Sequence, residues 1–239
     1  MQNSFYTRFL FGFIICLVYS VSHATTLILS AKQTQFVNFL LPKVELVNQT
    51  IHMQRQELEN LYQRHHVNQS LTSLEKTWLL DLAQKYKLKH FNLNKPQAWQ
   101  NLLSRVDVIP VDLAIAQAAN ESGWGSSRFA KLGNNYFGQW CYKAGCGIVP
   151  QRRPVGERYE VRKFVSAQAS VEHYIHNLNT NRAYKSLRRI RQRLRQDNQP
   201  ITAVALAEGL VHYSQRGSAY VTSIKTLIRR VDVTVRTNA

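Results

Sequence analysis

The chain of 239 residues is 44% hydrophobic and 19% charged, a composition that allows a buried core and excludes a wholly disordered chain. Its formal net charge of +17 favours polyanionic partners such as nucleic acid, anionic lipid or acidic polymers.

The first residues have the layout of a cleavable signal peptide. Arg8 precedes an apolar run from Phe9 to Val21, which closes in Ser22-His23-Ala24. The run is shorter than the ~20 residues of a membrane-spanning helix, and Cys16 lies among bulky residues, which disfavours a lipid anchor. We therefore expect residues 1–24 to be removed, and the mature chain to be soluble and exported to the periplasm or cell envelope. Export makes nucleic acid the least expected polyanion.

Helical spacing dominates the segment that follows. Apolar residues recur at intervals of three, four or seven from Lys32 to about His65, and Pro42 offers a point where this stretch would divide into two helices. Thr72 and Glu75 form a capping-box pattern that predicts the start of the next helix.

A further helix is expected from about Pro96 to Arg105, with Asn94 as its N-cap. None of these helices carries a catalytic constellation. We interpret residues 25–107 as a helical N-terminal extension and residues 108–239 as the catalytic domain.

The next predicted helix, from Pro110 to Ser122, is rich in alanine and ends at Gly123 and Gly125. Glu121 lies at its carboxyl end, where the helix dipole and apolar neighbours both disfavour the ionised carboxylate. A carboxyl group that remains protonated near neutral pH could protonate the leaving oxygen of a glycosidic bond. From position alone, however, a solvated helix-end glutamate is the commoner case.

Glycines, prolines and short alternating stretches between Gly133 and Phe164 predict a loop and a hairpin, with strands at Gly147–Val149 and Tyr159–Val161. Helical periodicity returns across residues 171–178, 184–194 and 221–231. The expected fold is therefore α+β, mostly α, with a small β-hairpin lobe.

Cys141 and Cys146 are the cysteines that remain after leader removal, and Gly145 can supply a turn between them. In an oxidising compartment we expect them to form a disulfide, with two separate buried thiols as the alternative. No third ligand accompanies them, so no metal site and no cofactor are expected.

The string Glu121-Ser122-Gly123-Trp124-Gly125-Ser126-Ser127, followed by Asn134-Asn135-Tyr136-Phe137-Gly138, resembles the glucosaminidase family of peptidoglycan hydrolases, in particular its Bax-type and flagellar rod-cap members. The resemblance covers about residues 108–232. It implies a lysozyme-like fold and an endo-β-N-acetylglucosaminidase activity that cleaves the β-1,4 bond after N-acetylglucosamine in the glycan strand. It also implies that Glu121 is the catalytic acid.

Lytic transglycosylases share the helix-borne glutamate but follow it with a different segment, so Tyr136-Phe137-Gly138-Gln139-Trp140 favours a hydrolase. A second carboxylate would activate water or stabilise the sugar cation. Glu157 and Glu160 lie in the hairpin lobe where the family carries a mobile acid, and the sequence does not choose between them. Either could instead form a surface ion pair, in which case the substrate's own acetamido group could act as nucleophile.

Other residues of the resemblance would form the groove. Tyr213 and Tyr220 match the family's paired tyrosines, and we expect Tyr213 to orient the sugar and Tyr220 mainly to pack. The residues expected to line the groove, through stacking or amide hydrogen bonds, are Trp124, Asn135, Tyr136, Phe137 and Tyr220.

Two further patterns involve histidines and arginines. His173 and His176 have helical spacing but no third ligand, so we interpret them as structural. The arginines of the strongest basic run would form either a solvated helix face or a surface that docks on anionic wall polymer or membrane; they are Arg188, Arg189, Arg191, Arg193 and Arg195.

The sequence thus predicts an exported glycoside hydrolase whose partner is the peptidoglycan glycan strand. Two alternatives stay open: a lytic transglycosylase, and a non-catalytic wall-binding or assembly factor with a lysozyme-like groove. The sequence does not indicate an oligomeric state.

Overall fold

A computed structural model describes residues 28–238, and the expected signal peptide lies outside the described residues. The described chain is mostly helical with one small antiparallel sheet, as the sequence predicts. Within residues 28–238, no helix combines the length and apolar character needed to cross a membrane.

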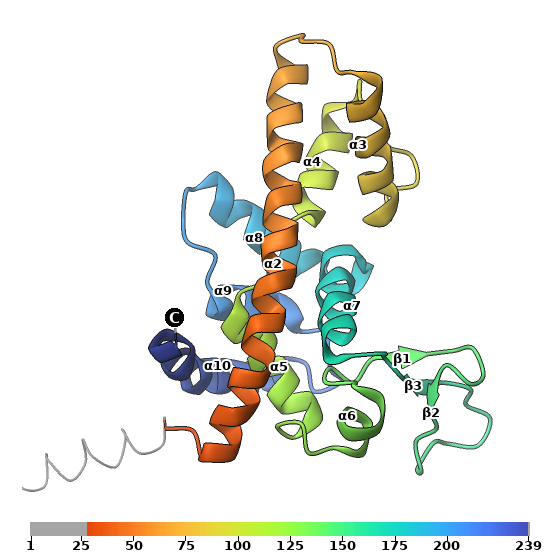
Figure 1. Cartoon of the computed structure of the whole chain (residues 1–239), viewed down its shortest axis with the longest axis vertical. Coiled ribbons are helices and arrows are strands. Elements are labelled where there is room, and N and C mark those ends of the chain that lie inside the picture. Colours follow the sequence, from red (N-terminus) through yellow and green to blue (C-terminus); the bar gives the residue numbers. More distant parts are fainter. Residues whose placement is uncertain (1–27, 239) are drawn as a thin grey trace, which may run out of the picture.

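Figure 1 shows a long helix, α2, along the long axis of the molecule, with α3 and α4 beside the end where it finishes. Further along the axis, α2 contacts α5, α7 and α10. The helices are α2 (Ala31–His66), α3 (Ser73–Lys85), α4 (Pro96–Arg105), α5 (Val111–Ser122), α6 (Arg128–Gly133), α7 (Ala167–Thr180), α8 (Lys185–Gln196), α9 (Ala203–Ala207) and α10 (Ser218–Asn238), with short 3₁₀ turns η1 (Arg182–Tyr184) and η2 (Glu208–Leu210).

The structure confirms some of the predicted helix boundaries and corrects others. Pro42 lies inside α2 without dividing it, so the expectation of two helices is wrong. The capping box of Thr72 and Glu75 is present at the start of α3. At α4 the N-cap is Lys95, with no side-chain cap hydrogen bond, rather than Asn94. Pro96 is the first residue of that helix. Because proline has no backbone N–H, one fewer N–H group at this end of the helix needs a hydrogen-bond acceptor.

Helix α5 lies inside the core, and its alanine content explains why. Seven successive residues from Leu113 to Ala119 are buried. This part of the helix is therefore enclosed on all sides and has no solvent-exposed face. Small side chains let α2, α9 and α10 pack closely against it. One continuous hydrophobic core joins buried residues of α2 to those of α5 and α10. The position of α5, including its carboxyl end, is therefore fixed by packing against the neighbouring helices.

The sheet has the strand order β1-β3-β2, in which β3 (Glu160–Arg162) pairs antiparallel with both β1 (Trp140–Cys141) and β2 (Gly147–Ile148). The two predicted strands correspond to β2 and β3, whereas β1 was not predicted. Gly147 is required by the pairing, because a Cβ there would lie 2.1 Å from the carbonyl oxygen of Val161.

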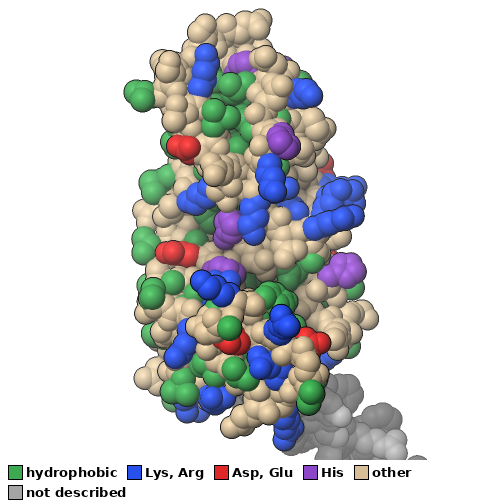
Figure 2. Space-filling model, turned by 90° about the vertical axis from the view of Figure 1, so that its right-hand side faces the viewer, with side chains coloured by type: hydrophobic (Ala, Val, Ile, Leu, Met, Phe, Trp, Pro, Cys, Tyr) green, Lys and Arg blue, Asp and Glu red, His purple; other side chains and the backbone are tan. Residues whose placement is uncertain are grey.

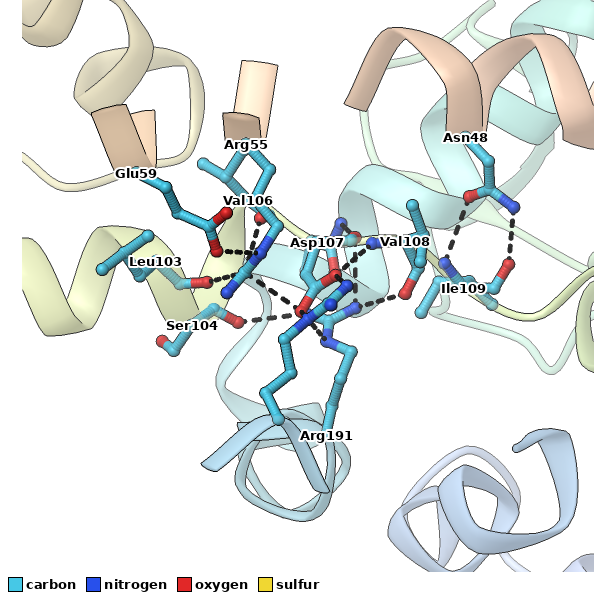
Figure 3. Close-up of polar contacts among 12 residues, drawn as sticks. Asn48, Arg55, Glu59, Leu103, Ser104, Val106, Asp107, Val108, Ile109 and Arg191 are labelled. Carbon is cyan, nitrogen blue, oxygen red and sulfur yellow. Dashed lines mark hydrogen bonds and ion pairs between the residues drawn. The ribbon is translucent and has the colours of Figure 1, made fainter. Parts of the chain in front are cut away.

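A buried ionic cluster joins α2, α8 and the segment between α4 and α5 (Figure 3). The carboxylate of Asp107, 2% exposed, contacts Arg55 at 3.0 Å, Arg195 at 2.6 Å and Arg191 at 3.6 Å. Burial by itself would raise the pKa of Asp107, but the hydrogen bonds from Arg195 and the charges of Arg191 and Arg55 outweigh it, so the pKa is lowered. Nearby, Asn48 exchanges two hydrogen bonds with the backbone of Ile109.

This cluster corrects the expectation of a solvated arginine face on α8 for part of the basic run, while Arg189 and Arg193 are exposed. Arg188 and Arg191 are buried, at 7% and 1% exposure. Arg191 donates to the carbonyl oxygens of Asp107, Val108 and Ser104. The guanidinium groups satisfy carbonyls at the ends of other elements, which helical periodicity alone does not reveal.

Candidate active site

The Ser-Gly-Trp-Gly string after Glu121 forms a tight turn. The hydroxyl of Ser122 donates to the carbonyl of Ala118 at 2.6 Å and accepts from the amide of Gly125 at 2.8 Å. Gly123 ends α5 in the left-handed conformation, with φ of 57°, and Gly125 follows with φ of 74°. The turn reverses the chain immediately after the acid and holds the last turn of the helix.

Glu121 receives its hydrogen bonds on a single oxygen. Asn120 donates to Oε1 at 3.0 Å, and the hydroxyl of Tyr220 donates to the same atom at 2.9 Å. The other oxygen faces Gly138, where an added Cβ would lie 3.4 Å from Oε2. A protonated carboxyl with two donors on Oε1 carries its proton on Oε2, so the geometry defines which oxygen can act as acid.

A buried chain of hydrogen bonds sets the direction of the Tyr220 hydroxyl. Tyr174 donates to Oε1 of Gln117 at 2.6 Å, and Nε2 of Gln117 donates to the Tyr220 oxygen at 2.9 Å. Tyr220 then has its proton available for Glu121. Because Gln117 and Tyr174 are buried, this order of donors is held away from competing water.

The electrostatic surroundings favour the neutral acid. Burial raises the pKa of Glu121 above its ordinary value, and the hydrogen bonds from Asn120 and Tyr220 and the charge of Arg216 lower it by less. The expected direction is therefore confirmed.

The two tyrosines that match the family's pair make different contacts. Tyr220, expected mainly to pack, touches the acid, whereas the hydroxyl of Tyr213 donates to the carbonyl of Phe137 at 3.0 Å. Their rings stack with centroids 5.4 Å apart and planes 8° apart. Tyr213 thus connects the Asn-Asn-x-Phe-Gly segment to the chain that precedes α10, while Tyr220 connects α10 to α5.

Asn135 and Phe137 lie beneath the surface instead of lining an open groove. The amide group of Asn135 donates to the carbonyls of Gln139 and Arg162, and its oxygen accepts from the amides of Phe137 and Gln139. Phe137 stacks on Tyr174 with centroids 3.9 Å apart. These residues shape the loop that brings Gly138 to the acid.

Trp124 and Tyr136 form an aromatic cluster with α2. Phe36 meets the Trp124 ring edge-on at 5.9 Å and the Tyr136 ring at 6.1 Å, and Phe39 lies 5.8 Å from Tyr136. Trp124 is half-buried and Tyr136 buried. Helix α2 therefore contributes to the surroundings of the site, which the sequence did not indicate because Phe36 lies far from Glu121 along the chain.

The two candidate second acids differ in their surroundings. Glu160 in β3 is 7% exposed and accepts hydrogen bonds from the amides of Gly145 at 3.0 Å and Gly147 at 2.8 Å. These bonds lower the pKa of Glu160. Glu157 is exposed in the preceding turn, where its amide donates to Pro154. Glu160 thus braces a loop, whereas the Glu157 side chain is on the surface.

The loop that Glu160 braces is closed by a disulfide between Cys141 and Cys146, with Cα atoms 6.2 Å apart. The two sulfurs and the Glu160 carboxylate form a group of three potential metal ligands in the described part of the chain. Both sulfurs are bonded to each other and neither is a thiolate, so this group does not suit a metal ion.

The two helix α7 histidines have structural surroundings. The Nε2 atom of His176 lies 2.7 Å from the carbonyl of Lys85. Burial lowers the pKa of His173 to about 4, aided by nearby cations, and its ring packs on Phe164. Neither geometry points to a shared metal ion.

An exposed aromatic pair on the sheet was missed by the sequence reasoning. The rings of Trp140 and Tyr159 stack with centroids 4.2 Å apart and planes 11° apart, and Trp140 is 51% exposed. The pairing of β1 with β3 brings them together. An exposed flat aromatic surface suits the apolar face of a sugar ring.

A mostly α domain with a shielded carboxylic acid at the end of a buried helix, beside a small antiparallel sheet, is consistent with the class of lysozyme-like glucosaminidase domains. The family profile described as mannosyl-glycoprotein endo-beta-N-acetylglucosaminidase matches residues 96–233. The match covers more than half of the chain, and the chain belongs to this glucosaminidase family, as its motifs predicted.

The chain is 40% identical over 146 residues to Protein bax of Escherichia coli strain K12, a match that covers 61% of this chain and 52% of that protein. The matched region is thus about half the length of this relative. No solved structure matches the chain significantly. Family membership supports a glycan-hydrolase type of function.

Proposed function

We propose that the protein is an exported endo-β-N-acetylglucosaminidase that hydrolyses the β-1,4 bond after N-acetylglucosamine in peptidoglycan. The observation that carries the proposal is the Glu121 carboxyl, whose pKa is raised by burial and whose Oε2 atom remains directed toward Gly138. The proposed catalytic domain is residues 108–239, preceded by the helical extension of residues 25–107 and a signal peptide over residues 1–24.

In the proposed reaction, Glu121 donates its proton from Oε2 to the glycosidic oxygen as the bond between that oxygen and the anomeric carbon breaks. The carboxylate that forms receives the hydrogen bonds of Asn120 and Tyr220 on Oε1, which stabilise its developing charge. A water molecule adds its oxygen to the anomeric carbon and gives up a proton, so each product ends with a hydroxyl group.

For the group that receives this proton we propose Glu157. Its side chain is exposed in a turn of the β lobe, whereas Glu160 is engaged by two backbone amides. A surface acid on a turn can move toward bound substrate, and closure of loops over substrate is common in enzymes. The substrate's acetamido group is the alternative nucleophile, and its use would leave both acids dispensable.

We propose that the stacked rings of Trp140 and Tyr159 carry the glycan strand. Trp124 would lie nearer the acid, while the buried Asn135, Tyr136 and Phe137 shape the wall behind it. Tyr213 would help to orient the sugar by fixing the Phe137 segment through its hydrogen bond to the Phe137 carbonyl. Tyr220 would do so through its hydrogen bond to the carboxyl group of Glu121.

The deciding experiment is mass spectrometry of muropeptides released from purified sacculi. Reducing N-acetylglucosamine ends support the proposal, whereas anhydro-muramic ends would replace it with a lytic transglycosylase. Glu121→Gln keeps the side-chain size but removes the transferable proton, so turnover should be lost while binding survives. Equal product release by Glu121→Gln and wild type would overturn the assignment of the acid. No product from the folded wild-type protein, with binding retained, would favour a wall-binding factor.

A further inference from the structure

A basic pocket lies apart from the candidate active site, between α4, the end of α7, and α8. It has a volume of about 550 Å³, and the residues that line it include five cations and no acid. The cations are Arg105, Arg182, Lys185, Arg188 and Arg189. Amide and hydroxyl side chains of the neighbouring helices complete the lining, so most of the surface consists of hydrogen-bonding groups.

The charge of this pocket is not balanced by the protein. None of its five cations forms an ion pair with a carboxylate in the part of the chain that the structure describes. On the same helix α8, Arg191 and Arg195 do pair with Asp107. The basic run of α8 therefore has two parts. One part neutralises the buried Asp107, and the other lines a pocket whose positive charge is not balanced by any acidic residue of the described chain.

Two of the cations are held in place. Arg188 donates through Nη1 to the carbonyls of Leu178 and Asn181, and Arg105 donates through Nη1 to those of Tyr86 and Lys87. Burial, with the charges of Arg105 and Arg191, lowers the pKa of Arg188 to about 10, so the group is still charged at neutral pH. A bound anion would relieve the repulsion between neighbouring cations without having to order them first.

The chemistry of the donors favours phosphate. Guanidinium groups offer paired N–H donors that match phosphate oxygens, and Lys185 adds a compact charge. A single carboxylate would neutralise only one of the five cations, whereas a phosphate or pyrophosphate brings more charge and more acceptor oxygens. The face in Figure 2 carries basic side chains over its height and few acidic ones, so the general field of the surface also attracts anions.

We propose that this pocket is a binding site for a multiply charged phosphate group, with Arg105 and Arg188 as its fixed base and Arg182, Lys185 and Arg189 at its exposed rim. The site is separate from Glu121 and does not depend on the proposed hydrolase activity. The phosphate can belong to a small anion or to a lipid headgroup that ends in a phosphate monoester, because both present several charged oxygens.

Calorimetry with sodium pyrophosphate at constant ionic strength tests the site. Arg182→Gln combined with Arg189→Gln removes two exposed charges of the rim, and pyrophosphate should bind about tenfold or more weakly. The matched control combines Arg193→Gln and Arg229→Gln, which removes two exposed charges that do not line the pocket. This control should bind as wild type does, and thermal melts verify that both variants fold.

Equal weakening in the two variants would show general charge attraction and overturn the proposal, as would absence of pyrophosphate binding to the wild type. Equally tight binding of citrate would also overturn it, because the site would then not select phosphate. Once pyrophosphate binding is established, vesicles of phosphatidic acid, whose headgroup is a phosphate monoester, and of neutral phosphatidylcholine distinguish the sources. Rim-dependent binding to the phosphatidic acid vesicles, but not to the neutral ones, supports a lipid headgroup, whereas rim-dependent binding of pyrophosphate without binding to either vesicle supports a small phosphate ligand.

Discussion

The Tyr220 hydroxyl donates a hydrogen bond of 2.9 Å to Oε1 of Glu121, although the two residues are 99 positions apart in the chain. The bond connects the last helix to the end of the buried helix α5. Because Gln117 donates to the same hydroxyl, the Tyr220 proton is directed at the acid. The contact therefore both orients Glu121 and opposes part of the rise in its pKa.

Tyr220→Phe should move the alkaline limb of the activity profile to higher pH. The lost donor lowers the pKa of Glu121 in the wild type, so its removal raises that pKa further. We expect kcat to fall about tenfold as the acid loses its orientation, and the fold to lose about 1 kcal/mol because Gln117 loses an acceptor. Tyr213→Phe, which removes only the bond to Phe137, is the control. A pH–rate profile that shifts equally in both variants would contradict the assignment.

Glu121→Gln should make the protein more stable at neutral pH, even as activity is lost. The folded-state pKa of Glu121 is raised, so the folded chain retains a proton over a range where the unfolded chain has released it. Wild-type stability therefore falls as pH rises from about 4.3, the ordinary glutamate value, through the raised value. Denaturant unfolding measured across this range should show a difference between variant and wild type that grows with pH. A constant difference would refute the raised pKa.

Asp107→Asn should be strongly destabilising, by about 3–5 kcal/mol, because Arg55, Arg191 and Arg195 lose their shared carboxylate in a buried setting. The pKa of Asp107 is lowered, so its contribution is present above the ordinary aspartate pKa and is lost as pH falls through the folded value. Urea unfolding at neutral and acidic pH measures both effects. Asp81→Asn, at an exposed position on α3, is the control, and a similar cost for the two changes would rule out the proposed role.

Glu157→Gln and Glu160→Gln should have opposite consequences. We expect Glu157→Gln to reduce kcat at least about a hundredfold with little change in stability, as for loss of a general base. Glu160→Gln places an amide donor near the amides of Gly145 and Gly147, so it should loosen the disulfide loop while catalysis by Glu157 persists. Kinetics on sacculi and hydrogen exchange of the loop amides distinguish the two. If both variants remain fully active, the substrate's acetamido group takes over the role of Glu157.

Trp140→Ala should weaken substrate binding more than turnover, because stacking contributes about 1 kcal/mol without touching the reacting bond. The expected result is a KM raised roughly fivefold at nearly unchanged kcat. Tyr142→Ala provides the comparison, since Tyr142 is 72% exposed and stacks on no other aromatic ring within residues 28–238. Equal effects of the two changes on KM would exclude a specific sugar platform.

The sequence by itself determined the features that depend on neighbouring residues. Alanine content and helical spacing predicted α5, the paired glycines predicted its end, and the position of Glu121 predicted the direction of its pKa shift, which the structure confirms. The motif after Glu121 identified the family correctly. Helix propensity, capping and turn geometry act within a few residues and can be read from the sequence, whereas the raised pKa of Glu121 is caused mainly by burial, so the sequence predicted only its direction.

Only the tertiary structure decided which side chains meet across long separations. It brought Tyr220 to Glu121, Phe36 to Trp124, and Trp140 to Tyr159. It also turned Arg191 inward to Asp107, although the same helical pattern is compatible with a solvated face. Such contacts depend on how helices pack and on where buried carbonyls and carboxylates need hydrogen-bond donors. The periodicity of a single segment predicts neither the packing nor the positions of these acceptors.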